Sequence, residues 1–275
     1  MVLTDMRTLP QLLLGSLLLR PYVYAFLALH LAGASALLGW SRTLAFTLIT
    51  WGIAFLAEAS SIRTGFPFGW YYYIQTTADK ELWIAGVPFF DSLSFPFLLV
   101  SSYGLAWLLL FEMAARGPEA GDGGWPRPPR LMHLAVATFL FVLVDVVIDP
   151  VALRGDRWFL GQIYGYPEPG VYFGVPLANF LGWGLVGAVA TALYHAWEGR
   201  QLLLRAVGSR GRAWLCPGLY FIVLAFNLTV TFVLGEWWLG VCGLMLSLLV
   251  VAWMVRALTG PGAVLVRPQR EGGSW

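Results

Sequence analysis

Seven apolar runs, each close to the roughly 20 residues that span a bilayer, alternate along the chain with polar or aromatic connections. They extend over Pro21–Trp40, Thr43–Ala59, Ser92–Met113, Leu131–Leu153, Pro176–Glu198, Trp214–Leu234 and Trp237–Leu258. This pattern predicts an all-α, polytopic membrane protein, a bundle of about seven transmembrane helices. Residues 21–258 form the transmembrane domain. We expect an N-terminal interfacial segment at 1–20, where Arg20 interrupts a short apolar stretch, and a flexible C-terminal tail at 259–275.

The longest aromatic connection runs from Ser60 to Asp91. It is too polar to span a membrane and is typical of an aromatic belt or of a segment that dips partway into the bilayer. Its aromatic residues are Phe66, Phe68, Trp70, Tyr71, Tyr72, Tyr73 and Trp83.

The composition supports lipid as the solvent. Hydrophobic residues make up 59% of the 275 positions and charged residues only 12%, against about 25% charged in a soluble domain. A net charge of +2, without one basic patch, argues against a nucleic-acid partner. Cys216 and Cys242 lie in separate apolar runs, which favours small core side chains over a redox or metal site.

Positive charges predict the orientation. With seven helices, six of the 17 Lys and Arg residues fall on the N-terminal side and eleven on the other. The positive-inside rule then puts the C-terminus in the cytoplasm and the N-terminus outside. It also brings the polar residues Glu58, Asp145, Asp149, Asn179 and Asn227 toward one membrane face.

Three acidic residues within the apolar runs are the candidates for chemistry, because a buried ionisable group is costly and often functional. Asp145 and Asp149, in LVDVVIDP, are four residues apart and share a helix face. Two carboxylates that close do not both ionise at low dielectric, so one is expected to hold a proton at neutral pH. Glu58, near the end of the second run, is the third candidate.

A structural role is the alternative for each acid. Asp149 caps the following loop in that interpretation, Asp145 pairs with Arg154 or Arg157, and Glu58 lies at the interface. Asn179 is either a catalytic group or a helix-to-helix hydrogen bond.

Other chemistries lack their signatures in the sequence. It contains no phosphate-binding glycine loop, no GxGxxG after a strand and no serine nucleophile motif. The DxxxD spacing is similar to the Mg²⁺-binding motif of membrane prenyltransferases, but those enzymes need a second such motif, which this sequence lacks. His30 is expected mid-membrane, whereas His133 and His195 lie toward one face, so three histidine ligands do not meet. We therefore expect neither a metal nor a cofactor.

Four blocks together carry a family resemblance: EASSIRTGFPFGWYYY, GVPFFDSLSF, LVDVVIDPVALRGDRW and YFGVPLANFLGW. In order and spacing they resemble the CruF-type carotenoid 1,2-hydratase family over Glu58 to Trp183. The matching motif positions are Glu58, Thr64, Gly65, Pro67, Phe68, Gly69, Asp145, Asp149, Pro150, Asn179 and Trp183.

The resemblance implies a membrane enzyme of a bacterial or archaeal cell. Such enzymes add water to the terminal double bond of an acyclic (ψ) carotenoid end group, as on γ-carotene or bisanhydrobacterioruberin, and give a tertiary alcohol. The substrate would arrive from the lipid, and association with other carotenoid biosynthesis enzymes is a further expectation.

The resemblance and the acids suggest one mechanism. Asp145, Asp149 or Glu58 protonates the alkene, and a neighbouring carboxylate or Asn179 orients the water. Aromatic faces then stabilise the cation. The side chains expected to contact the end group are Phe66, Phe68, Trp70, Tyr71 and Trp183. The alternatives are an end-group cyclase, which also starts by protonation, and a non-catalytic carotenoid binder or transporter.

Overall fold

The computed structural model describes residues 8–110, 128–198 and 214–259. Within them, seven helical spans are long and apolar enough to cross a membrane, which confirms the predicted all-α membrane bundle. The spans are α2 (Pro21–Leu38), α3 (Trp40–Thr64), α4 and α5 (Phe89–Ser92 and Ser94–Leu109, one span together), α7 (Arg130–Ala152), α8 (Leu177–Glu198), α9 (Leu215–Val233) and α10 (Trp237–Thr259). Most of the predicted 259–275 tail lies outside the described residues.

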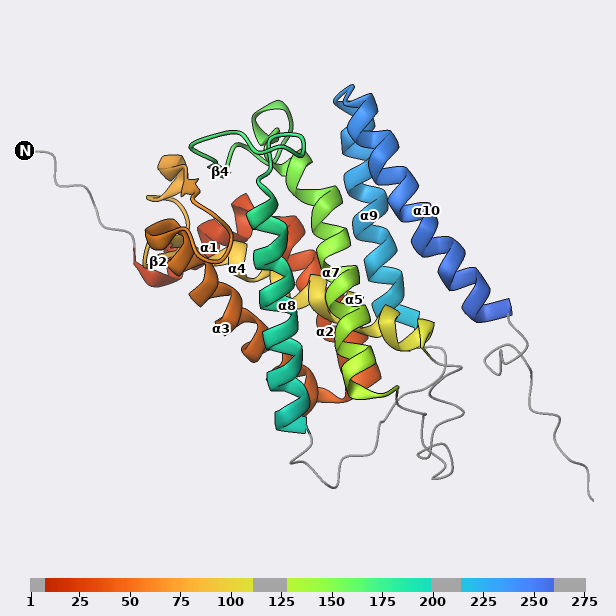
Figure 1. Ribbon diagram of the computed structural model, residues 1–275. Helices are drawn as coiled ribbons and strands as arrows, with labels where there is room; N and C mark the ends of the chain where they lie inside the picture. The colour runs from red at the N-terminus through yellow and green to blue at the C-terminus, as the bar shows by residue number, and fades with distance from the viewer. Residues whose placement is uncertain (1–7, 111–127, 199–213, 260–275) are drawn as a thin grey trace, which may run out of the picture.

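The central helix of the bundle is α5. It packs against α2, α3, α7 and α9, and 78% of its most apolar stretch is buried, compared with 28% for α3 or α10. In Figure 1, α9 and α10 lie at one edge, α3 and α8 toward the other, and α5 and α7 between them. Close approach at the centre requires a glycine, since a Cβ on Gly104 would lie 2.5 Å from the Cβ of Cys216 on α9.

The boundaries of α3 differ most from the prediction. Helix α3 continues five residues past Ala59 and ends at Thr64, where Gly65 adopts the left-handed conformation (φ 76°) common at helix C-termini. Glu58 therefore lies inside the helix and is only 3% exposed, not at its end. The apolar pattern stops before the helix does because Ser60, Ser61 and Arg63 belong to its last turns.

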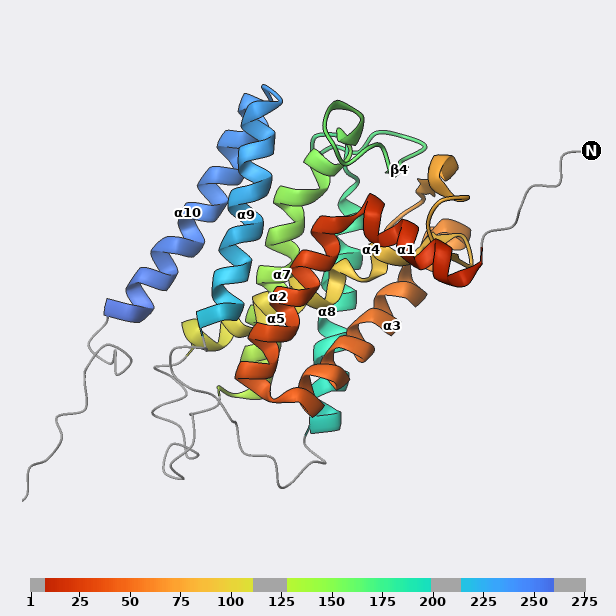
Figure 2. The same cartoon turned by 180° about the vertical axis from the view of Figure 1, so that it is seen from behind.

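The N-terminal helix α1 (Leu9–Leu19) crosses the end of the bundle instead of running along it, as Figure 2 shows. It turns into α2 at Arg20, after which Pro21 occupies the first helical position of α2, a favoured site for proline. Its leucines are largely exposed, including Leu14 and Leu18. The interfacial role remains a prediction.

Two connections cover the end of the bundle and carry the few strands of the described part. Strand β1 (Tyr72–Tyr73) pairs antiparallel with β4 (Tyr164–Gly165), so that Tyr73 lies opposite Tyr164. Strands β2 (Trp83–Ile84) and β3 (Val87–Pro88) form a short hairpin before α4. Short 3₁₀ turns occupy Gln75–Thr77 and Gly155–Arg157. The β1–β4 pair therefore joins the connection after α3 to the connection after α7.

Candidate active site

A cavity of about 160 Å³ opens beneath these connections, between α2, α3, α5, α7, α8 and α9. Its walls are mainly aromatic and aliphatic, but polar side chains reach it from several elements. The polar and tyrosine residues in its lining are Tyr22, Glu58, Tyr71, Tyr73, Asp91, Ser94, Asp145, Asp149, Tyr164, Tyr166, Asn179 and Asn227. An apolar cavity with a few converging polar groups is the usual form of a ligand site.

The two aspartates of α7 share one amide. Asn179 Nδ2 on α8 donates at 2.9 Å to Asp145 Oδ2 and at 2.9 Å to Asp149 Oδ2. The spacing of four residues places both carboxyls on the α8-facing side of the helix, as predicted. Asn179 therefore fixes the positions of the two carboxyl groups relative to each other.

The hydrogen bonds of the two aspartates are unequal. Asp149 also accepts from the Tyr164 hydroxyl and, at 3.0 Å, from the Tyr166 hydroxyl. Asp145 is fully buried, and its Oδ1 has no hydrogen-bond partner among the described residues. Since hydrogen bonds stabilise a carboxylate anion, Asp149 is suited to carry the negative charge and Asp145 to carry a proton on Oδ1.

A second acidic group enters the cavity from α3 and α4. Glu58 Oε1 accepts from the Tyr73 hydroxyl at 3.1 Å, and Oε2 accepts from the Ser92 hydroxyl. The Tyr71 hydroxyl donates to the Tyr73 hydroxyl at 3.3 Å. Asp91, next to Ser92, also lines the cavity.

The tyrosines come from the β1–β4 pair and its flanks. Tyr73 and Tyr164 lie opposite each other across the strands, yet Tyr73 donates to Glu58 and Tyr164 to Asp149. Burial raises the pKa of Tyr73 and of Tyr164 well above the ordinary phenol value, so both hydroxyls keep their protons and act as donors. The ring of Tyr71 contacts Tyr73 and Tyr164, with centroids 5.2 and 6.2 Å apart. The pair thus connects both acidic groups.

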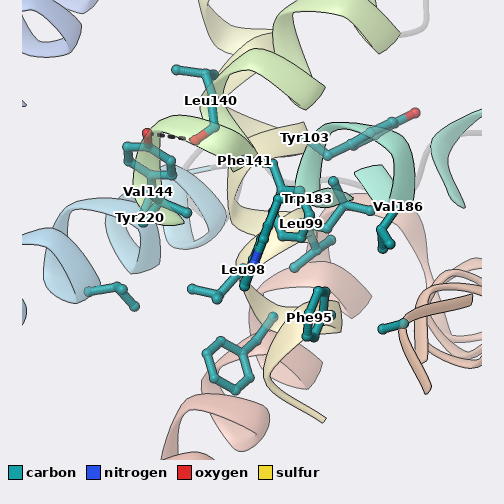
Figure 3. Close-up of a cluster of buried hydrophobic side chains, with 14 of the residues drawn as sticks. Phe95, Leu98, Leu99, Tyr103, Leu140, Phe141, Val144, Trp183, Val186 and Tyr220 are labelled. Carbon is teal, nitrogen blue, oxygen red and sulfur yellow. Dashed lines mark hydrogen bonds between the residues drawn. The ribbon is translucent and has the colours of Figure 1, made fainter. Parts of the chain in front are cut away.

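An aromatic wall faces these polar groups. The rings of Phe95 and Trp183 stack with centroids 4.3 Å apart, and Phe68 contacts Phe95 at 6.0 Å. Phe141 packs behind Trp183 at 4.7 Å. Figure 3 shows Phe95, Phe141 and Trp183 together within the buried cluster of α5, α7 and α8. The faces of such rings attract positive charge.

The structure gathers most of the residues singled out from the sequence. Those that line the cavity are Glu58, Asp145, Asp149, Asn179, Phe68, Tyr71 and Trp183. Phe66 and Trp70 do not line it and are 64% and 57% exposed, a position typical of interfacial aromatic residues.

Sequence reasoning missed Asp91, Ser92, Tyr73, Tyr164 and Tyr166 as polar members of the site. A signal existed for two of them, since Asp91 and Ser92 stand in the block GVPFFDSLSF at the start of an apolar run. The tyrosines are brought in by strand pairing between distant connections, which local patterns do not reveal.

The structural alternative for Asp145 is wrong. Arg154 and Arg157 form ion pairs with Glu236 in the turn between α9 and α10, at 2.9 and 2.5 Å. Hydrogen bonding to Arg154 is the largest cause that lowers the pKa of Glu236. The two arginines lie past the end of α7 and point to the neighbouring helix pair, while Asp145 faces α8.

The chain is similar to known proteins in two comparisons. A family model described as "Carotenoid biosynthesis protein" matches residues 12–250. Bisanhydrobacterioruberin hydratase of Haloarcula japonica is 32% identical over 150 residues, which are 54% of this chain and 42% of that protein. The chain therefore matches less than half of that relative's length. No solved structure matches.

Proposed function

The chain belongs to the carotenoid biosynthesis protein family, and from this premise we propose that it hydrates the terminal C1,C2 double bond of an acyclic carotenoid end group. The product is a tertiary alcohol, formed by acid catalysis. One observation supports the mechanism. Asp145 is buried, has an oxygen without a hydrogen-bond partner among the described residues, and lines an aromatic cavity beside Asp149. The relative with the hydratase name supports the choice of reaction.

Asp145 is the proton donor in this proposal. The alkene is a very weak base and takes a proton only from an acid placed against it in a dry site. Transfer to C2, the less substituted carbon, leaves a tertiary cation at C1. Asp149 stays anionic, held by Tyr164, Tyr166 and Asn179, and its charge compensates the cation.

The aromatic wall stabilises the same cation. Trp183, Phe95 and Phe68 present ring surfaces to the cavity, and a cation over such a face gains about 0.5–2 kcal/mol. Water then attacks C1. The net reaction adds one water to the alkene and gives the alcohol. It involves no net oxidation or reduction, so it requires no redox partner.

The cavity is suited to one end of a long polyene. Its walls include Val23 and Phe26 of α2, and Val223 and Phe226 of α9, all apolar residues of membrane spans. We infer that the end group enters between helices from the lipid and that the rest of the polyene stays in an apolar environment. The bias of positive charge orients the C-terminus to the cytoplasm, which places the carboxyl groups near the outer face of the cell membrane.

The test is to express the chain in a bacterium that accumulates lycopene and to resolve the pigments by chromatography with mass detection. Hydration gives a more polar pigment, heavier by one water, with an unchanged chromophore. The matched control is Asp145→Asn, which we expect to be inactive when present in the membrane at the wild-type amount.

Other results would contradict the proposal. A product of equal mass that absorbs at shorter wavelength indicates a cyclase. Pigment that is retained by the purified protein but unchanged, with lycopene and with γ-carotene alike, indicates a binding protein.

A further inference from the structure

Two cavity carboxyls of the described residues, Asp91 and Glu58, have no task in the proposed mechanism. Asp91 is the better candidate for one. It lies on α4, and its side chain is half-buried and open to the cavity. Asp145 and Asp149 reach the same cavity from α7. The substrate end group would thus have carboxyl groups from two separate elements against it.

The other carboxyls are poorly placed to take up a proton. Both oxygens of Glu58 accept hydroxyl hydrogen bonds, from Tyr73 and Ser92. Asp149 accepts three hydrogen bonds from its neighbours. A carboxylate whose lone pairs already accept hydrogen bonds is a weaker base toward an additional proton. Asp91 also lines the cavity, and its hydrogen-bonding neighbour is Tyr73, whose hydroxyl already donates to Glu58.

A buried cation, Arg20, lies near Asp91 and is partly neutralised by Glu81. Arg20 stacks on the ring of Phe90, the preceding residue, at 4.5 Å from the centroid. Its guanidinium also forms an ion pair with Glu81 at 3.4 Å and is only 7% exposed as a residue. A positive charge fixed beside a carboxyl stabilises its carboxylate.

We propose that Asp91 is the general base of the reaction: its carboxylate binds the attacking water in the cavity and accepts the proton that this water releases. This inference rests on the proposed hydration. The proton of Asp145 bonds to C2 while the π electrons of the double bond move to the new C–H bond. A lone pair of water then forms the C1–O bond, and one water O–H bond breaks toward Asp91. A second water carries a proton from Asp91 back to Asp145 and completes the cycle.

Because Asp145 protonates the alkene and Asp91 activates the water, protonation and water capture can be measured separately in heavy water. The deuterated Asp145 delivers deuterium to C2. If capture by water fails, the cation loses a proton or deuteron to Asp145 and returns as alkene. Recovered substrate then carries deuterium although no alcohol has formed. Hydration and deuterium exchange therefore report on different residues.

The experiment uses membranes that contain the full chain, incubated with lycopene in heavy water, with alcohol and deuterated lycopene measured by mass spectrometry. We expect Asp91→Asn to lower alcohol formation about 100-fold, the usual scale of general-base catalysis, and to keep the deuterium exchange. Asp145→Asn should remove both. Asp91→Glu should restore part of the alcohol formation. The matched control is Asp79→Asn, the same change at an exposed position of the preceding connection, which should retain both.

Two results would overturn the assignment of Asp91 while the proposed hydration stands: wild-type alcohol formation by Asp91→Asn, or loss of both alcohol and exchange in that variant. If the wild-type chain forms neither alcohol nor deuterated substrate, the proposed hydration itself fails.

Discussion

At the residue scale, Asp145 and Asp149 show how two identical side chains acquire different roles. They stand one helical turn apart and share Asn179, but the tyrosine hydroxyls reach only Asp149. The spacing in the sequence predicts the shared face. It does not predict which aspartate is the better acid, because the deciding donors, Tyr164 and Tyr166, come from a connection without helical periodicity.

We expect asparagine at these two positions to have different effects. Asp145→Asn removes the proton donor and should lower hydration by at least about 100-fold, with little change in melting temperature. In the wild type, Asp149 accepts hydrogen bonds from Tyr164, Tyr166 and Asn179. Asp149→Asn replaces one accepting oxygen by an NH2 group, and a buried donor left unpaired costs about 1–3 kcal/mol of folding free energy. Its melting temperature in detergent should fall. Equal melting temperatures for both variants would contradict this assignment.

At the element scale, α8 approaches the connection after α3 without a side chain between them. A Cβ on Gly182 would lie 3.0 Å from the backbone nitrogen and Cα of Phe68 and 2.4 Å from its ring. This contact sets the position of Trp183, the next residue, against the aromatic wall. Gly182 belongs to the sequence block YFGVPLANFLGW, which carries the family resemblance. Only the packing shows that this glycine makes room for the backbone of Phe68.

Gly182→Ala should therefore force α8 and this connection apart. Overpacking of this kind costs about 1–3 kcal/mol, so we expect a lower melting temperature together with weaker hydration. Gly218→Ala on α9 is the matched control, because a Cβ there meets no atom within 4 Å. The explanation fails if both alanine variants melt at the wild-type temperature.

At the scale of the whole molecule, the ion pairs of Glu236 tie the last two helices to the end of α7. Local patterns predict the spans well, since each apolar run alone specifies a helix in lipid. They predict the contacts between spans poorly, and the pairing of Arg154 and Arg157 with Glu236 instead of Asp145 is an example. The sequence shows that these three residues are charged but does not predict that they pair with one another.

These ion pairs predict a pH-dependent stability. The pKa of Glu236 is lowered in the folded protein, chiefly by hydrogen bonding to Arg154. Its contribution is therefore present above the ordinary carboxyl pKa of about 4.3 and is lost as the pH falls through the lower folded value. Glu236→Gln should melt below the wild type at pH 7 and approach it as the pH falls below about 4. A constant difference between the two down to pH 3 would argue against the ion pairs as the cause.

The amide of Asn179 has a further consequence for how the chain enters the bilayer. Helix α7 carries both aspartates, and an aspartate within a span opposes insertion, by about 2.5–3.5 kcal/mol at the centre of the span. During synthesis α7 precedes α8, so the aspartates reach the lipid before the amide that binds them both. Helix α7 also has the highest mean hydropathy of the seven spans, which offsets this penalty. The acids can therefore be kept only while the rest of α7 stays strongly apolar, and its apolar side chains are as necessary to the site as the carboxyl groups.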